Sequence, residues 1–253
     1  MEDQALNQGA PAPPARTGNG RFAVFAPLLV IGLAALGSLV GVLLFLNRGT
    51  PPKRDLAAEA RADLERRNFR PLSEPLQALL ADARYRPIPT QTHPLLLGPA
   101  PDFSLREVNG GDWSLSQELK KGPVVLIFYY GYHCNHCVSQ LFGIDQDIDK
   151  FRELGVRVAA VSADAPELTR ERFAEYGAFR FPVLSDPGNK VAEKYGVFTP
   201  SARTGEEGDL MHGTFLISRQ GKVLWTNRGD NPFTENRTLL HEIARAEGRA
   251  PKK

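Results

Sequence analysis

Residues 124–137 read VVLIFYYGYHCNHC and contain the only two cysteines of this 253-residue chain, Cys134 and Cys137. The apolar run from Val124 to Tyr129 is typical of a buried strand, and the apolar residues that recur every three or four positions after Cys137 are typical of a helix. The C-x-x-C pair therefore falls at a strand-to-helix junction. Backbone N–H groups at the start of a helix favour a thiolate, which is the nucleophile in disulfide exchange. We predict redox chemistry at this junction.

Two neighbouring cysteines also occur as small buried apolar residues or as half of a structural zinc site. Zinc usually takes four Cys or His ligands, and the chain has no second C-x-x-C motif. His133 and His136 could complete such a set only as a cramped tetrahedron built within a few residues. The redox interpretation is therefore favoured over metal binding and over a purely structural pair.

The composition limits the classes of protein to which the chain can belong. Hydrophobic residues make up 42% of it, enough for one sizeable core with appendages. The formal net charge of +2 is too small to indicate a nucleic-acid partner. We therefore expect a folded domain that does not bind nucleic acid.

The apolar segment 22–46 is uncharged over 25 residues, long enough to cross a bilayer as a helix. No small-residue cleavage site follows it, so we predict an uncleaved signal anchor in contact with membrane lipid. The basic residues Arg48, Lys53 and Arg54 would keep the following part of the chain in the cytoplasm by the positive-inside rule. Large domains translocate largely regardless of charge, however, and disulfides persist outside the cytoplasm. We expect a single-pass membrane protein whose C-terminal part lies on the extracytoplasmic (periplasmic or outer) face.

The chain divides into five predicted segments. They are a disordered tail at 1–21, the transmembrane anchor at 22–46, a charged helical stalk or linker at 47–94, an α/β domain at 95–248 and a second tail at 249–253. Within the stalk, one helix is predicted from Arg54 to Asn68. Another is predicted to start near Ser73, with Ser73 as its N-cap, and to end by Tyr85. The interspersed acidic residues favour a solvated stalk over a basic amphipathic helix lying on anionic lipid.

Strand and helix patterns alternate along the segment 95–248. Strands are predicted at 123–130, 156–161, 181–184, 213–217 and 222–225, and helices after Cys137 and at 168–176, 191–195 and 235–247. Strands that alternate with helices and end in a hairpin and a helix imply a mixed sheet covered on both faces.

Five segments of this domain resemble, in the same order, the motifs of the redoxin (alkyl hydroperoxide reductase/thiol-specific antioxidant) family of the thioredoxin-like superfamily. They are Gly98–Leu105, Val124–Leu141, Ala159–Asp164, Phe181–Asp186 and Thr214–Val223. The resemblance runs from about Gly98 to Ala246. It implies an α/β, thioredoxin-like fold, with a mixed central sheet and helices on both faces, here preceded by one transmembrane helix. It also implies an antioxidant or thiol-disulfide oxidoreductase, which needs no cofactor beyond a redox-active disulfide.

The chain departs from the peroxiredoxins of that family at the peroxide pocket. Their motif P-x-x-x-T-x-x-C, aligned with Cys137 as the peroxidatic cysteine, places Tyr130 at the Pro position and Cys134 at the Thr position. The family's pocket arginine falls at His212. These changes argue against fast peroxide reduction. Aligned with thioredoxin-type oxidoreductases, Cys134 is the nucleophile and Cys137 the resolving thiol, and His212 stands where a cis-proline is usual.

His136 directly precedes Cys137, as in the C-x-H-C sites of oxidising disulfide isomerases, which the motif resembles. A hydrogen-bonding group there would favour the Cys134 thiolate and raise the redox potential above that of thioredoxin; the alternative is an exposed loop histidine without effect. We name Tyr132, for the substrate groove, and His133 and His212 as further candidate site residues. The expected substrate is a thiol- or disulfide-bearing protein or a small hydroperoxide.

A binding function is the alternative to an enzyme. Membrane-anchored copper chaperones of the Sco type share this fold, and Gly131-Tyr132-His133-Cys134 resembles the approach to their metal site. The copper ligands would be Cys134, Cys137 and His212, because two thiolates and an imidazole suit copper. The Sco cysteines are spaced C-x-x-x-C, however, one residue wider than here.

Overall fold

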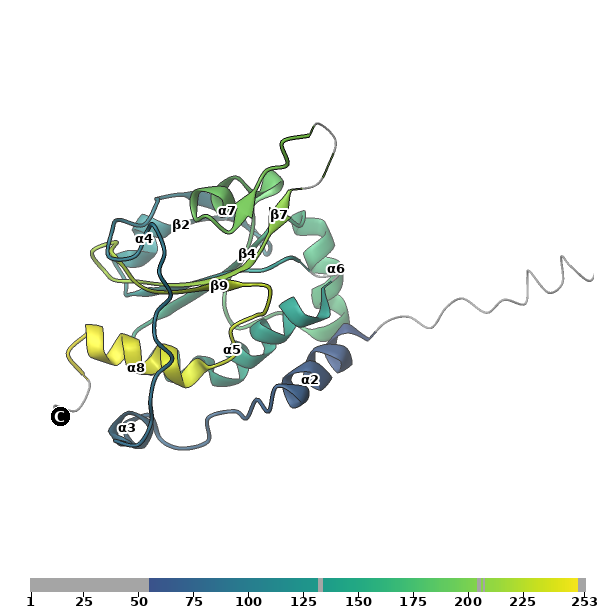
Figure 1. Ribbon diagram of the computed structural model, residues 1–253. Coiled ribbons are helices and arrows are strands. Elements are labelled where there is room, and N and C mark those ends of the chain that lie inside the picture. The colour runs from purple at the N-terminus through teal and green to yellow at the C-terminus, as the bar shows by residue number, and fades with distance from the viewer. Residues whose placement is uncertain (1–54, 132–133, 204–205, 207, 250–253) are drawn as a thin grey trace, which may run out of the picture. The chain divides into compact units, whose positions relative to one another are not determined.

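The computed structural model describes residues 55–131, 134–203, 206 and 208–249 (Figure 1). The predicted tail at 1–21 and the predicted membrane anchor at 22–46 lie outside the described residues, as does most of the tail at 249–253. Within the described part of the chain, no helix combines the length and the apolar character that a membrane crossing requires.

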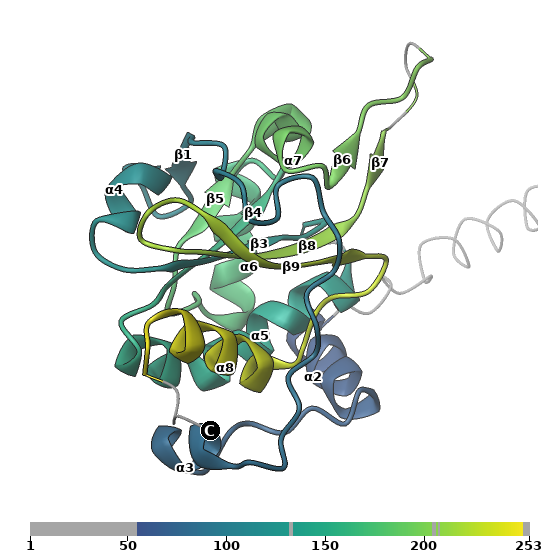
Figure 2. The ribbon, with the colours of Figure 1, turned by 60° about the vertical axis from the view of Figure 1, so that its left-hand side comes forward.

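A seven-stranded mixed sheet forms the centre of the described unit. Its strand order is β2 (Asp112–Ser114), β1 (Ser104–Glu107), β5 (Val183–Ser185), β4 (Arg157–Ser162), β3 (Val124–Phe128), β8 (His212–Ile217) and β9 (Val223–Gly229). Strands β3, β4 and β5 are parallel, and the other neighbouring pairs are antiparallel. The short strands β6 (Phe198–Thr199) and β7 (Asp209–Leu210) pair separately as a hairpin that projects from the sheet (Figure 2).

Helices cover both faces of the sheet. The helices are α2 (Leu56–Arg66), α3 (Leu76–Ala81), α4 (Leu115–Leu119), α5 (Asn135–Glu153), α6 (Pro166–Tyr176), α7 (Lys190–Lys194) and α8 (Asn236–Ala246), with a 3₁₀ turn at Pro187–Asn189. Helices α5 and α8 pack on one face, with α2 and α3 outside them, and α4 and α7 lie on the other (Figure 2). The thioredoxin-like α/β fold predicted from the sequence is confirmed.

Strand β3 contributes to both hydrophobic cores because its side chains alternate between the two faces. Val125 and Ile127 belong to the core under α5 and α8, and Val124, Leu126 and Phe128 to the core under α4 and α7. All five are buried, which explains the continuous apolar run in the sequence. The strand thus anchors the residues that follow it, which carry the cysteines.

The segment predicted as a separate stalk differs in the structure from residue 55 onward. Helix α2 packs against α5 through one buried apolar face, formed by Leu56, Ala57, Ala60 and Leu64. The chain then runs beside β9, where the backbone N–H groups of Gln91 and Leu97 donate to the carbonyls of Thr226 and Val223. The segment 55–94 is therefore packed on the α/β core. The charged residues of α2 flank a narrow apolar stripe, and this stripe is the face that α2 buries.

The predicted start of the second helix is wrong. The helix α3 begins at Leu76, with Pro75 rather than Ser73 at the N-cap. It ends at Ala81, in agreement with the predicted end by Tyr85. A residue before proline is disfavoured in the α conformation, so Glu74 cannot be helical and the helix begins after Pro75.

Candidate functional site

The two cysteines lie at the start of α5, at the junction where β3 has just ended. Cys134 is the N-cap residue of α5 in an extended conformation, and its carbonyl accepts hydrogen bonds from the N–H groups of Cys137 and Val138. Cys134 is half-buried, whereas Cys137 is fully buried against the core beneath α5. One cysteine can therefore meet a substrate and the other cannot.

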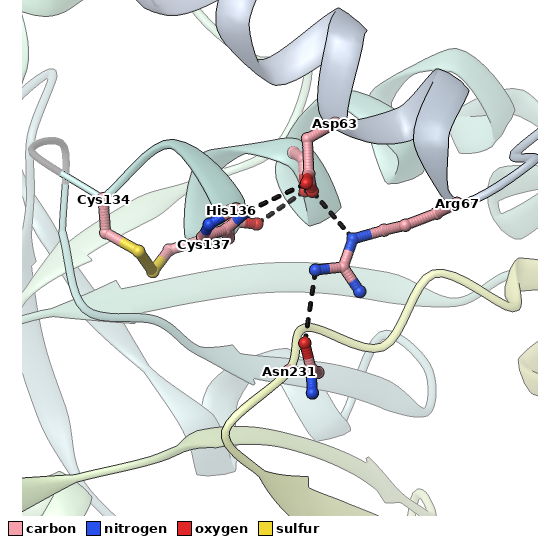
Figure 3. The surroundings of a disulfide bond; sticks show 7 residues. Asp63, Arg67, Cys134, His136, Cys137 and Asn231 are labelled. Carbon is pink, nitrogen blue, oxygen red and sulfur yellow. Dashed lines mark hydrogen bonds and ion pairs between the residues drawn. A yellow bond between two sulfur atoms is a disulfide. The ribbon is translucent and has the colours of Figure 1, made fainter.

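A disulfide joins Cys134 to Cys137, with their Cα atoms 5.3 Å apart (Figure 3). The chain contains no other cysteine, so the redox couple is this one pair. The helix begins immediately after Cys134, and its free N–H groups favour negative charge at that position. The site can thus hold a thiolate after reduction and re-form the disulfide within one helical turn.

The turn between β3 and α5 requires glycine at position 131. Gly131 has a φ of +108°, and a Cβ atom added there would lie 2.5 Å from Oδ2 of Asp164. Asp164, buried just after β4, therefore sits directly against the backbone that leads into the cysteines. Only a residue without a side chain allows this close approach.

We expect Gly131→Ala to destabilise the protein more than Gly177→Ala. Both glycines have positive φ, but a Cβ at Gly177 would meet nothing within 4 Å, so the second variant carries the backbone penalty alone. The clash with Asp164 should add about 1–2 kcal/mol of lost unfolding free energy. Urea unfolding followed by tryptophan fluorescence measures the difference, and equal losses in the two variants would contradict it.

His212 lies beside the disulfide, at the start of β8, the strand that pairs with β3. Residues Phe128 and Gly213 pair in the sheet, which brings the rings of Tyr130 and His212 together with their centroids 5.2 Å apart. One ring nitrogen of His212 and the sulfur atoms of Cys134 and Cys137 all lie within 4.8 Å of one another. The sequence prediction that His212 belongs to the site agrees with this position, although its role stays a prediction.

Burial keeps the His212 imidazole neutral. The ring is 3% exposed, and its Nδ1 atom has no hydrogen-bond partner among the described residues. This burial first, and then the coulombic effects of Arg67 and His136, lower the pKa of His212 to about 4. A neutral imidazole thus faces the disulfide at physiological pH.

His136 is held by a residue that sequence reasoning missed. Its Nδ1 atom lies 2.9 Å from Oδ1 of Asp63 on α2, while 59% of the imidazole side chain remains exposed. Ser139, one turn into α5, donates a hydrogen bond of 2.8 Å to Oδ2 of the same carboxylate. The available signal was an acidic residue within the apolar stripe of α2, which continues from Ala60 to Leu64.

Asp63 is an ionised carboxylate inside the protein. It is 2% exposed, and burial by itself would raise its pKa. The hydrogen bonds from Arg67, Ser139 and His136 outweigh that effect and hold the pKa of Asp63 well below its usual range. The carboxylate therefore accepts hydrogen bonds from the first turn of α5 at any physiological pH.

The remaining predicted site residues, Tyr132 and His133, lie outside the described residues, so their roles stay predictions. Tyr130, at the position of the peroxiredoxin proline, is half-buried and packs on His212. A tyrosine ring, rather than the proline expected from the family motif, therefore borders His212.

Comparison with known proteins gives consistent matches. The model of the AhpC/TSA family matches residues 97–226. Peroxiredoxin Bcp of Escherichia coli K12 is 34% identical over 126 residues, which cover 49% of this chain and 79% of that protein. Thiol-disulfide oxidoreductase ResA of Bacillus thuringiensis is 26% identical over 144 residues, covering 57% of this chain and 76% of ResA.

A solved structure shows the same fold. The crystal structure of peroxidoxin BcpB from Mycobacterium tuberculosis superimposes with a TM-score of 0.54 at 27% sequence identity. The superposition covers 61% of this chain and 98% of that one. The helix α2, at Leu56–Arg66, precedes the region that the family model matches.

Proposed function

Because this chain belongs to the AhpC/TSA family, we propose that it is a thiol-disulfide oxidoreductase that cycles Cys134 and Cys137 between dithiol and disulfide. The family membership makes it an oxidoreductase enzyme related to peroxiredoxins and to thiol-disulfide oxidoreductases. The observation that carries the finer proposal is the unequal exposure of the two cysteines. A half-exposed N-cap cysteine and a fully buried partner suit nucleophile and resolving thiol, respectively.

The proposed reaction proceeds in two exchange steps. The Cys134 thiolate attacks one sulfur of a substrate disulfide, so that an S–S bond forms to the enzyme and one substrate thiolate leaves. Cys137 then loses its proton and attacks the Cys134 sulfur, which releases the second substrate thiolate. The substrate disulfide is reduced by two electrons and the enzyme dithiol is oxidised. Reversed, the same steps oxidise a dithiol substrate.

A hydroperoxide is the second candidate substrate. In that case Cys134 attacks the peroxide oxygen, an alcohol or water leaves, and the resulting sulfenic acid condenses with Cys137 to release water. The named relatives support this chemistry, but Tyr130 occupies the place of the pocket proline. We therefore place disulfide exchange ahead of peroxide reduction.

The test compares the two substrates directly. The full-length chain, reduced, metal-free and kept in detergent, is mixed with hydrogen peroxide or with a disulfide-bonded protein, and thiol loss is followed over time. We expect rapid exchange with the protein disulfide and slow reaction with peroxide. Rapid peroxide consumption would instead make the chain a peroxidase, and inertness toward both substrates would overturn the proposed function.

The named relatives favour redox function over the copper-binding alternative. The donor atoms of Cys134, Cys137 and His212 do lie within 4.8 Å of one another, so reduced protein could offer them to copper. Tight copper binding that disappears in His212→Ala, together with absent disulfide exchange, would reverse this preference.

We further propose that the segment 22–46 anchors the chain in a membrane, with the disulfide on the extracytoplasmic face. Two observations support this topology. The segment is uncharged over a length that can cross a bilayer, and disulfides persist in oxidising compartments. In intact cells treated with a permeant reductant, an impermeant maleimide should label Cys134. Labelling only after the cells are lysed would contradict the proposed side.

A further inference from the structure

Helix α2 reaches the redox site although it precedes the region matched by the family model. Its buried Asp63 binds two residues near the start of α5, accepting hydrogen bonds from Nδ1 of His136 at 2.9 Å and from Oγ of Ser139 at 2.8 Å. The helix has Cys134 as its N-cap and contains Cys137 in its first turn. A single carboxylate thus ties the added helix to the peptide segment that carries the disulfide.

The same carboxylate also holds the guanidinium of Arg67 in place. Nε of Arg67 donates to Oδ2 of Asp63 at 2.7 Å, and Nη2 of Arg67 donates to Oδ1 of Asn231 at 3.3 Å (Figure 3). The Arg67 side chain is 24% exposed, so water screens its charge only in part.

Arg67 is joined to the cysteine-bearing segment through one shared partner. Its guanidinium and the imidazole of His136 contact the same carboxylate, at 2.7 Å and 2.9 Å, and His136 directly precedes Cys137. A negative charge that develops on a sulfur after reduction would therefore be attracted by the guanidinium.

We infer that Asp63 and Arg67 are positioning residues of the redox site: Asp63 holds the His136 imidazole and the Arg67 guanidinium at the start of α5, and the guanidinium charge favours the thiolate formed on reduction. The inference rests on the proposed function. Reduction adds two electrons to the disulfide and, with Cys134 as thiolate, one proton to Cys137. A fixed positive charge stabilises this reduced form and so makes the disulfide easier to reduce.

The test is the equilibrium of the full-length chain with glutathione at neutral pH. In Arg67→Met the equilibrium constant for reduction should fall roughly three- to tenfold, and tenfold corresponds to about 30 mV for a two-electron couple. Arg67→Lys, which keeps the charge, should recover most of this loss. The matched control is Arg66→Met, because Arg66 also pairs with Asp63, at 3.0 Å, but its side chain is 62% exposed. The control should change the constant less than twofold.

One further measurement and one further variant address loss of folding. Melting of the oxidised proteins shows whether α2 stays docked in each variant. If Arg67→Met does not fold, Asn231→Asp serves instead, because it sets a carboxylate against the guanidinium without altering α2 and should shift the equilibrium in the same direction.

Three outcomes decide the matter. A shift in Arg67→Met that Arg67→Lys reverses and Arg66→Met lacks supports the inference. An unchanged constant in Arg67→Met, or an equal shift in Arg66→Met, overturns it while normal exchange by the unmodified chain leaves the proposed function standing. If the unmodified chain does not exchange with glutathione at all, the proposed function itself fails.

Discussion

Cys134→Ser should abolish disulfide exchange by this chain, whereas Cys137→Ser should leave the first step intact and trap the substrate. A serine hydroxyl stays protonated at neutral pH and cannot replace a thiolate, so the first variant should lose more than roughly a thousandfold in rate. In the second variant the half-exposed Cys134 still attacks, but no thiol is available to resolve the mixed disulfide.

The measurement is non-reducing electrophoresis of each variant after it meets a disulfide-bonded protein. Cys137→Ser should yield a covalent adduct that dithiothreitol dissolves, and Cys134→Ser should yield none. The double variant serves as the background control. The reverse pattern, with the adduct formed by Cys137 alone, would contradict the assignment of the nucleophile and return Cys137 to the peroxidatic position.

Acidification from pH 7 to pH 4 should cost the protein about 3 kcal/mol of unfolding free energy through His212 alone. The pKa of this imidazole is about 4 in the folded protein and ordinarily 6.5, so the unfolded chain binds the proton first. The stability that the neutral ring contributes is complete above the unfolded pKa. It is lost as the pH falls from about 6.5 to about 4.

Urea unfolding of the oxidised protein at several pH values measures this effect. His212→Phe removes the titrating group and keeps an aromatic ring against Tyr130, and the described structure shows no hydrogen bond to Nδ1 that the change would break. Other titrating groups contribute alike in both proteins, so the difference between the two curves isolates His212. The variant should lose clearly less stability on acidification. Parallel curves would show that the buried imidazole does not resist protonation.

The centre of the fold was predictable because β3 is apolar throughout and β4 beside it is largely apolar. The strand at 123–130 was predicted within two residues of β3, and the helix at 235–247 within one residue of α8. The position of His212 followed from the family pattern, and the pairing of Phe128 with Gly213 gives its physical reason. The sequence also predicted that Cys134 is the more exposed cysteine of the pair, since the first cysteine of a strand-to-helix junction occupies the N-cap.

The contribution of α2 was not predicted, because charged residues dominate its sequence and its apolar stripe is narrow. The pattern of Ala, Arg, Glu and Leu from Leu56 to Arg66 is that of a solvated helix, and only its three-dimensional partner shows which face is buried. Asp63 looks like any surface acid until Arg67, Ser139 and His136 surround it. A buried ionised group depends on contacts between distant segments, and no local pattern records those contacts.

The docking of α2 determines how much of the chain must be present before a redox property is meaningful. A protein whose N-terminal residues are removed so that it starts at residue 97, where the family similarity begins, would keep both cysteines and the whole sheet. It would also lose Asp63 and Arg67 and uncover the apolar surface of α5 on which α2 packs. If Arg67 favours the reduced form as inferred above, the midpoint potential of that fragment should lie below that of a protein that starts at α2.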